Sequence, residues 1–364
     1  MKANEYSFKL VDETSLYKAI VFFREYGFCV IGDLGETHDI DLVRSEVIGA
    51  SALGRRNVAR IAERIEQGAT DDDLLLDDSV EVRCTGRINR PLKPVNDVIW
   101  MPNFQRILCD EMVLRPLRLL FGPHFCLHNL HSKIVKVSQG DSSSIEFGQD
   151  PFGMPRVYNG PEDFREWHCD WPHDPIGYGG SNPNENVGFI MSDHSDQFVA
   201  LTSIFYLNDC DDKSGSTIVV PSSHKDKRKP RDPESGINVA KPIDGEIHLC
   251  VSKGSVLLMD SRLWHTAPFF NRGSTDRVAA VARWAPWWLN TNDYAGKSRF
   301  NMVNRPVSKF EWSSFPEALR PHTLNLCPEV DNAIHDDLLR ISGVAAESTL
   351  KDYAERARCE AKSR

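Results

Sequence analysis

Apolar residues recur at helical spacing through most of the first 125 residues. The clearest case is a predicted helix that Thr14 can cap and that Gly27 can end after Tyr26. Its apolar face comprises Leu16, Ala19, Ile20 and Phe23. A short strand, FCVIGDL, follows, and further helical patterns cover about 38–49, 53–67 and 103–120. The N-terminal part of the chain is therefore predicted to be mostly helical.

From residue 125 onward the pattern changes to short apolar runs rich in β-formers, separated by Gly, Pro, Asn and Asp. The runs are FCLHNLHSKIVKVS, VALTSIFYLND, STIVVPSS, GSVLLMDSRLWHTA and RVAAVARWAPWW. Several short strands in one block are typical of a sandwich or barrel. Helical patterns return after about 290, at 331–341 and 346–360. We predict a single domain over 1–364, with a helical N-terminal part (1–124), a β-core (125–290) and a helical C-terminal extension (291–364).

Composition and charge narrow the class of protein. The 364 residues include 41% hydrophobic and 26% charged residues, which is typical of a globular protein. The net charge of −9 gives no positive field to gather phosphates, so no nucleic-acid partner is expected. The polar N-terminus and the absence of a long apolar run predict a soluble, cytoplasmic protein without a membrane partner. Nine scattered cysteines without a C-x-x-C pair indicate neither a disulfide framework nor a zinc ribbon.

Candidate metal ligands come from the spacing His-x-Asp, which places both side chains on one face of a strand. The spacing occurs four times: His168/Asp170, His194/Asp196, His224/Asp226 and His335/Asp337. The last lies in a helical pattern, where the two side chains diverge, and the third opens the basic run KDKRKPR, which suits a solvated loop or a phosphate-binding segment. The first is preferred because tryptophans on both sides can wall a half-buried pocket. The second remains a rival.

A third ligand and a charged partner are found further along the chain. His265 lies in the β-run GSVLLMDSRLWHTA, although an isolated His beside a Trp is more often a core residue. Arg277 follows 12 residues later and opens the apolar run RVAAVARW, where a charge needs a buried partner. A guanidinium in such a place suits bidentate capture of a carboxylate, with Arg272 and Arg283 as alternatives.

Three segments in this order, WHCDW, FYLNDCDDKSGSTIVVPSSHK and KGSVLLMDSRLWHTAPFFNRGSTDR, resemble the phytanoyl-CoA dioxygenase (PhyH) family of Fe(II)/2-oxoglutarate-dependent oxygenases. The resemblance spans roughly 125–290. It implies a double-stranded β-helix, the cupin-like jelly roll, with iron(II) at its mouth, 2-oxoglutarate as cosubstrate and O2 as oxidant. It also implies that His168, Asp170 and His265 are the iron ligands and that Arg277 pairs with the distal carboxylate of 2-oxoglutarate. Lys133 and Thr202 are weaker candidates for cosubstrate contacts.

Two positions depart from the family pattern. The family often has a Ser or Thr two residues after the distal histidine, where this chain has Ala267, and Ser222 replaces the glycine of Pro-Gly-Ser-His. A carboxylate at Asp170 favours hydroxylation, since the related halogenases have a small residue there. The predicted function is hydroxylation of a small molecule, a natural-product intermediate or polar metabolite, with release of succinate and CO2. The alternatives are a non-catalytic jelly-roll module that retains the pocket, and a cupin-like hydrolase or isomerase with another metal. The oligomeric state is left open.

Overall fold

The computed structural model of the chain describes most of the N-terminal part and the β-core. The described residues are 1–68, 83–85, 93–95, 98–138, 145–149, 155–158, 165, 167–170, 198–228, 230, 235–268, 271–289, 302–304, 307–327 and 330. The predicted C-terminal helices at 331–341 and 346–360 therefore lie outside the described residues, as do His194, Asp196, His335 and Asp337.

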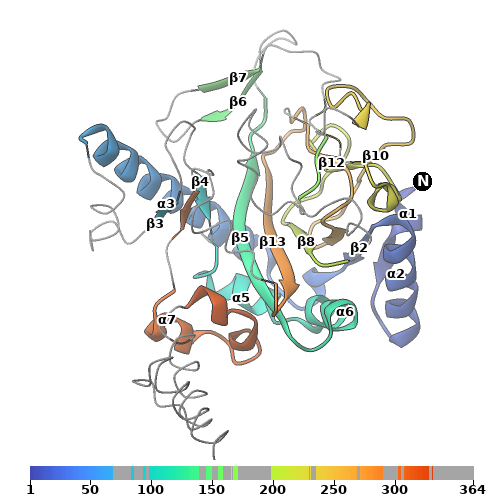
Figure 1. The fold of residues 1–364 in the computed structure, drawn as a ribbon, viewed down its shortest axis with the longest axis horizontal. Coiled ribbons are helices and arrows are strands. Elements are labelled where there is room, and N and C mark those ends of the chain that lie inside the picture. The colour runs from blue at the N-terminus through green and yellow to red at the C-terminus, as the bar shows by residue number, and fades with distance from the viewer. Residues whose placement is uncertain are drawn as a thin grey trace, which may run out of the picture.

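A six-stranded sheet forms the centre of the molecule (Figure 1). Its strands, in spatial order, are β1 (Ser7–Lys9), β2 (Phe28–Gly32), β11 (Val256–Asp260), β8 (Leu201–Tyr206), β13 (Arg277–Pro286) and β5 (Phe125–Val135). All neighbouring pairs are antiparallel except β1 and β2. The N-terminal part therefore contributes two strands to the sheet in addition to its helices.

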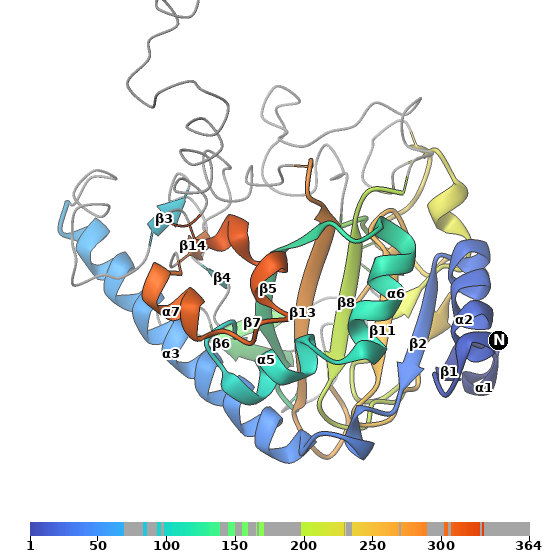
Figure 2. The ribbon, with the colours of Figure 1, turned by 90° about the horizontal axis from the view of Figure 1, so that it is seen from below.

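Helices cover one face of this sheet (Figure 2). They are α2 (Glu13–Tyr26), α3 (Ile40–Glu66), α5 (Pro102–Leu108) and α6 (Glu111–Phe121). Their apolar faces pack with alternate residues of the strands, such as Ile31, Phe205 and Ala280, in one buried cluster. Because successive strand residues point to opposite faces, the residues between these point away from the helices, toward the side that carries the candidate site.

The opposite face of the six-stranded sheet packs on a small three-stranded sheet. Its strands are β10 (Ile247–His248), β9 (Ile218–Val219) and β12 (His265–Thr266), all antiparallel. Phe28, Leu257 and Met259 from the large sheet and Val219 from the small sheet share a second buried cluster. In the described part of the chain, the two sheets remain separate hydrogen-bonded ladders and do not close into a continuous barrel. The predicted fold class, a mainly β, cupin-like core with flanking helices, is confirmed.

The remaining elements are short. They are α1 (Ala3–Tyr6), β3 (Arg83–Thr85), β4 (Lys93–Val95), β6 (Ile145–Gln149), β7 (Pro155–Tyr158), β14 (Met302–Asn304), α7 (Lys309–Ser314) and the 3-10 turns η1 (Leu34–Glu36), η5 (Ser223–Lys225), η8 (Arg320–His322) and η9 (Leu324–Leu326). Strand β14 lies between β3 and β4, and β6 pairs with β7. None of the helices in the described ranges is both long enough and apolar enough to cross a bilayer.

The helix boundaries refine the predictions from the sequence. Helix α2 ends at Tyr26 as predicted, with Gly27 in the left-handed region, but its cap is Asp12, whose side chain accepts from Ser15 N at 2.7 Å, and not Thr14. The patterns at 38–49 and 53–67 form one continuous helix, α3. The pattern at 103–120 forms two helices, because the Asp110 side chain accepts from Met112 N and starts α6 as a new helix.

Candidate functional site

The first two predicted ligands lie on a short segment, 167–170, that pairs with β12 of the small sheet. His168 and His265 form an antiparallel bridge in which each backbone N–H donates to the other's carbonyl, at 3.1 and 3.0 Å. Asp170 N donates to Ser261 O at 2.8 Å, which ties the same segment to the turn before β12. Two stretches about 95 residues apart in the sequence are thus held side by side by backbone hydrogen bonds.

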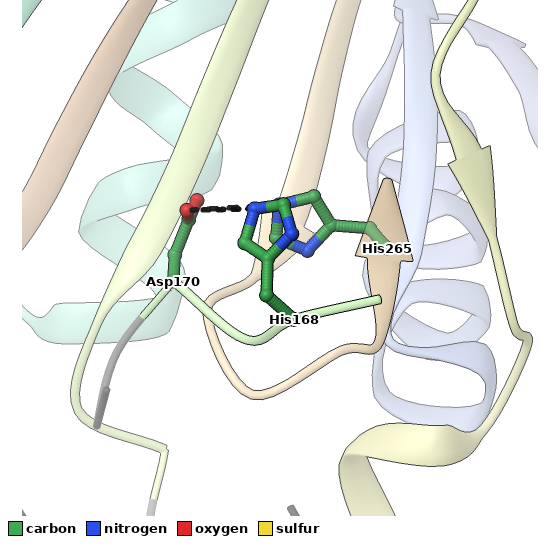
Figure 3. Close-up of side chains that lie close together, drawn as sticks. All are labelled: His168, Asp170 and His265. Carbon is green, nitrogen blue, oxygen red and sulfur yellow. Dashed lines mark ion pairs between the residues drawn. The ribbon is translucent and has the colours of Figure 1, made fainter. Parts of the chain in front are cut away.

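The three predicted ligands converge (Figure 3). His168, Asp170 and His265 each offer one donor atom, and these atoms lie within 4.8 Å of one another. Asp170 Oδ1 lies 3.6 Å from His265 Nε2 and 4.0 Å from His168 Nε2. His265 Nδ1 lies 2.9 Å from the Leu263 carbonyl, which can only accept, so Nδ1 donates there and Nε2 is the nitrogen that faces the cluster. The ring of His265 is therefore oriented for coordination through Nε2.

Two side chains from the large sheet hold the Asp170 carboxylate. The Thr202 hydroxyl donates to Oδ2 at 2.6 Å, and Arg283 Nη2 lies 3.1 Å from Oδ1. Thr202 and Arg283 are directly opposite each other on β8 and β13, so both side chains leave the same face of the sheet. Burial alone raises the pKa of Asp170, but Arg283, followed by His265 and His168, outweighs it, so the pKa lies well below its usual value. The carboxylate is therefore ionised at neutral pH.

This donor set fits a ferrous ion. Two imidazole nitrogens and one carboxylate oxygen on a single face are the facial triad that non-haem iron(II) oxygenases use, with the other coordination positions left open. Asp170 and His265 are buried, whereas the His168 side chain is 21% exposed, so His168 is the most accessible of the three ligands. Among the described residues, this is the one group of three potential ligands close enough to hold a metal ion.

Arg277, the predicted cosubstrate anchor, is a buried cation without a carboxylate partner in the part of the chain that the structure describes. It opens β13 and is only 3% exposed. Its Nη1 donates to the Gly215 carbonyl, its Nε has no hydrogen-bond partner, and no described carboxylate lies within 4 Å of the guanidinium. Burial lowers its pKa, partly offset by Tyr206 and Cys210. A buried guanidinium whose described neighbours offer no counter-ion is suited to receive an anion.

The other sequence candidates fall in different surroundings. Lys133 on β5 is exposed, and it is opposite Ala279, two residues along β13 from Arg277 and on the same face. Thr202, predicted as a cosubstrate contact, is bonded to Asp170. His224 is buried with Nε2 against the Arg24 carbonyl at the end of α2, and it belongs to no group of three potential metal ligands in the described part of the chain.

Two cations of the basic run after His224 are paired with carboxylates, which weakens its interpretation as a phosphate-binding segment. Lys225 Nζ lies 3.0 Å from Glu25, and Arg228 Nη2 lies 2.7 Å from Asp226. The Arg228 guanidinium also lies 5.6 Å from the centroid of the Trp264 ring, consistent with a cation–π contact. Lys225 therefore links the loop to α2, and Arg228 packs it against Trp264, the residue before β12.

The departure at Ser222 has a structural explanation. Ser222 adopts a left-handed φ of 63°, the conformation that favours glycine, and its hydroxyl donates to the Glu25 carbonyl at the end of α2 at 2.9 Å. The next residue, Ser223, accepts from Trp264 N at 2.8 Å. The Pro-x-Ser-His segment thus links the end of α2 to the strand that carries His265.

Three charged side chains at or near the site were missed or misplaced by sequence reasoning. Arg283 was named only as an alternative anchor, yet it pairs with Asp170. Its even spacing from Arg277 on one strand was the available signal. Arg165 and Glu246 form a part-buried ion pair at 2.7 Å next to the ligand segment, and no local sequence motif indicates it. Such pairs join residues far apart in the sequence, so only the fold reveals them.

A β-core in which two histidines and one buried carboxylate converge, with a buried arginine that has no carboxylate partner among the described residues, is typical of the non-haem iron oxygenases. The chain belongs to the phytanoyl-CoA dioxygenase (PhyH) family, whose model matches residues 23–279. The family consists of Fe(II)/2-oxoglutarate-dependent oxygenases, so the chain is an enzyme of this class, with iron(II) and 2-oxoglutarate as cofactors and O2 as the oxidant.

Solved structures with a remote similarity include several iron enzymes. The epimerase SnoN in complex with Fe3+, alpha ketoglutarate and nogalamycin RO is 15% identical, with a TM-score of 0.41 over 76% of this chain and 85% of that one. EctD from S. alaskensis with bound Fe is 14% identical, with a TM-score of 0.40 over 76% and 77%. HygX from Streptomyces hygroscopicus with nickel and 2-oxoglutarate is 16% identical, with a TM-score of 0.40 over 79% and 95%. No curated protein matches the chain significantly.

Proposed function

We propose that the chain hydroxylates an unactivated C–H bond of a small molecule. One atom of O2 enters the substrate C–H bond as hydroxyl and the other enters succinate, while the C1 carboxyl of 2-oxoglutarate leaves as CO2. The observation that carries this proposal is the convergence of His168, Asp170 and His265 within 4.8 Å. Natural-product intermediates and polar metabolites are the proposed substrate class.

The roles of the ligands follow from their surroundings. His168 and His265 would hold iron through their ring nitrogens and Asp170 through its carboxylate. When bound, the iron supplies the O2-activating chemistry. The protein contributes a carboxylate that stays ionised and two imidazoles whose spacing is set by a backbone bridge. Thr202 and Arg283 keep that carboxylate turned toward the histidines.

The proposed role of Arg277 is to bind the distal carboxylate of 2-oxoglutarate. Its charge is permanent, its guanidinium is buried, and its described surroundings provide a carbonyl but no carboxylate. Lys133, on the neighbouring strand and the same face, is proposed as a secondary contact to the same cosubstrate. The bond from Thr202 to Asp170 gives Thr202 a positioning role in addition to the proposed cosubstrate contact.

The test is succinate formation by the purified protein with iron(II), 2-oxoglutarate and fractionated metabolite extracts. We expect an extract-stimulated release of succinate, and mass spectrometry under 18O2 should show a product that has gained one labelled oxygen. His265→Ala should lose iron binding and turnover, whereas the exposed His124 gives a matched control, His124→Ala, that should keep both.

Two outcomes would contradict the proposal. Binding of iron(II) and 2-oxoglutarate without succinate under any condition would favour a binding module. Turnover retained with zinc, and independent of O2 and 2-oxoglutarate, would favour a hydrolase or isomerase.

A further inference from the structure

A bulge in the edge strand β5 brings one more histidine to the face that carries the site. On β13, Arg283 pairs with Asn129 and the next residue, Trp284, pairs with Leu127, so His128 is an extra residue between two ladder positions. Leu127 and Trp284 pack in the helix-side core, so His128 points to the opposite face, as Arg283 does. Bulges next to active sites commonly re-aim a side chain in this way.

The two ring nitrogens of His128 are buried and have no hydrogen-bond partner among the described residues. Both its ring nitrogens are inaccessible to solvent and neither makes a hydrogen bond. Among the histidines of the described residues, it is the one with both nitrogens in this state; His224, for example, uses its Nε2, and His322 uses its Nδ1. A buried polar group without a partner destabilises the folded protein, so it calls for a functional explanation.

The surroundings of His128 restrict the ligand that can satisfy it. Burial, followed by Arg283, lowers the pKa of His128 to about 4, so the ring is neutral at physiological pH and offers one N–H donor and one acceptor nitrogen. A hydroxyl group can donate and accept, whereas a carboxylate or phosphate can only accept. The fixed charge of Arg283 disfavours a cationic group at this place. Neutral hydroxyl groups match the site best.

We propose that His128 recognises hydroxyl groups of the substrate, which is accordingly an uncharged, hydroxylated small molecule bound beside the Asp170–Arg283 pair. This inference rests on the proposed function and deepens it by naming the substrate class. His128 is a specificity residue in this proposal and has no part in metal binding.

The experiment uses a panel of uncharged hydroxylated compounds, each with an O-methylated or deoxy partner, and reads stimulated succinate release by the iron-loaded enzyme. For the best pair, we expect wild-type kcat/KM to favour the hydroxylated compound at least tenfold. This preference should fall to about one in His128→Phe and be partly kept in His128→Asn, whose amide retains a donor and an acceptor. The matched control His322→Phe, another buried histidine, should leave the preference intact. A wild-type enzyme without any such preference, or a His128→Phe variant that keeps it, would overturn the proposal.

A second measurement, the stability of the ligand-free protein, tests the role of His128 without any substrate. Because neither nitrogen is bonded, His128→Phe should leave the urea midpoint of the ligand-free protein unchanged or raise it. His322→Phe should lower it, since His322 Nδ1 is bonded to the Phe125 carbonyl at 2.9 Å. An equal loss in both variants would show a structural role for His128 and overturn the proposal. Absence of succinate from the wild type under every condition would instead count against the proposed function, which this stability comparison does not depend on.

Discussion

Replacement of Arg277 gives the sharpest test of how the site binds its cosubstrate. In Arg277→Met, a buried cation whose described partners include no carboxylate becomes an apolar side chain of similar length. The ligand-free protein loses one hydrogen bond to Gly215 and is relieved of a desolvated charge, so its unfolding midpoint should stay the same or rise. Binding of 2-oxoglutarate loses a charge-assisted bidentate contact, which is worth about 2–4 kcal/mol, or roughly 30- to 700-fold in affinity.

The assay for this prediction separates cosubstrate binding from folding. Urea unfolding of the ligand-free variant is compared with the KM for 2-oxoglutarate in succinate formation and with the thermal shift that 2-oxoglutarate produces. A contrasting variant is Arg165→Met, in which the part-buried Glu246 carboxylate loses its 2.7 Å ion pair with a buried arginine. It should unfold at a lower denaturant concentration, because the carboxylate then keeps only the 3.5 Å approach of His248 and the hydrogen bond from Ile243 N. An unchanged KM in Arg277→Met, or a loss of stability as large as in Arg165→Met, would refute the assignment of an anion site to Arg277.

Three further predictions concern the metal site, acid stability and the packing of α2. Thr202→Val removes the 2.6 Å bond to Asp170 and should weaken Co(II) binding roughly 10- to 100-fold in a spectroscopic titration, with Thr202→Ser close to wild type; equal affinity for all three proteins would contradict it. The pKa of His128 falls from 6.5 to about 4 on folding, so the unfolded chain takes up a proton first as the pH drops. Protonation of this residue should therefore lower the free energy of unfolding by about 2 kcal/mol between pH 7 and pH 5. Urea titrations at the two pH values should show that His128→Phe lacks this loss. Gly27→Ala would place a Cβ 2.4 Å from His224 Nδ1 at a φ of 83° and should destabilise the protein by roughly 2–4 kcal/mol, and a midpoint within error of the wild type would refute this.

The triad could be predicted from the sequence because strand alternation is a local rule. His168 and Asp170 are two residues apart, and the pattern that marks them needs no knowledge of the rest of the fold. His265 was found through its β-run and the arginine that follows it. The structure brings all three together, and their roles as ligands stay a prediction that iron binding by the variants will test.

The side chains that hold Asp170 could not be predicted from the sequence, because the register of the strands decides which residues lie opposite each other. Thr202 meets Asp170 only because it lies opposite Arg283 across two strands that are about 75 residues apart in the sequence.

The helix boundaries could not be predicted exactly from local patterns either. Nothing in 50–52 breaks a helix, so the two predicted helices merge into α3. The Asp110 side chain caps a new helix, α6, so the apolar pattern at 103–120 is divided between two helices. The apolar pattern continues across this boundary and does not indicate it.

Strand β13 carries two buried arginines on one face, and they differ in whether a carboxylate pairs with them. Arg283 already pairs with Asp170, so the carboxylate proposed to hold iron is fixed in position without the metal. Arg277, six residues earlier, has no carboxylate partner among the described residues, which suits its proposed role as an anion site. Because both arginines belong to the same strand, the backbone sets the spacing between the proposed iron ligand and the proposed anion site. Preorganisation of this kind lowers the entropic cost of positioning the cosubstrate against the metal, and it predicts that Arg277→Lys, which keeps the charge but loses the planar fork, restores only part of the 2-oxoglutarate affinity.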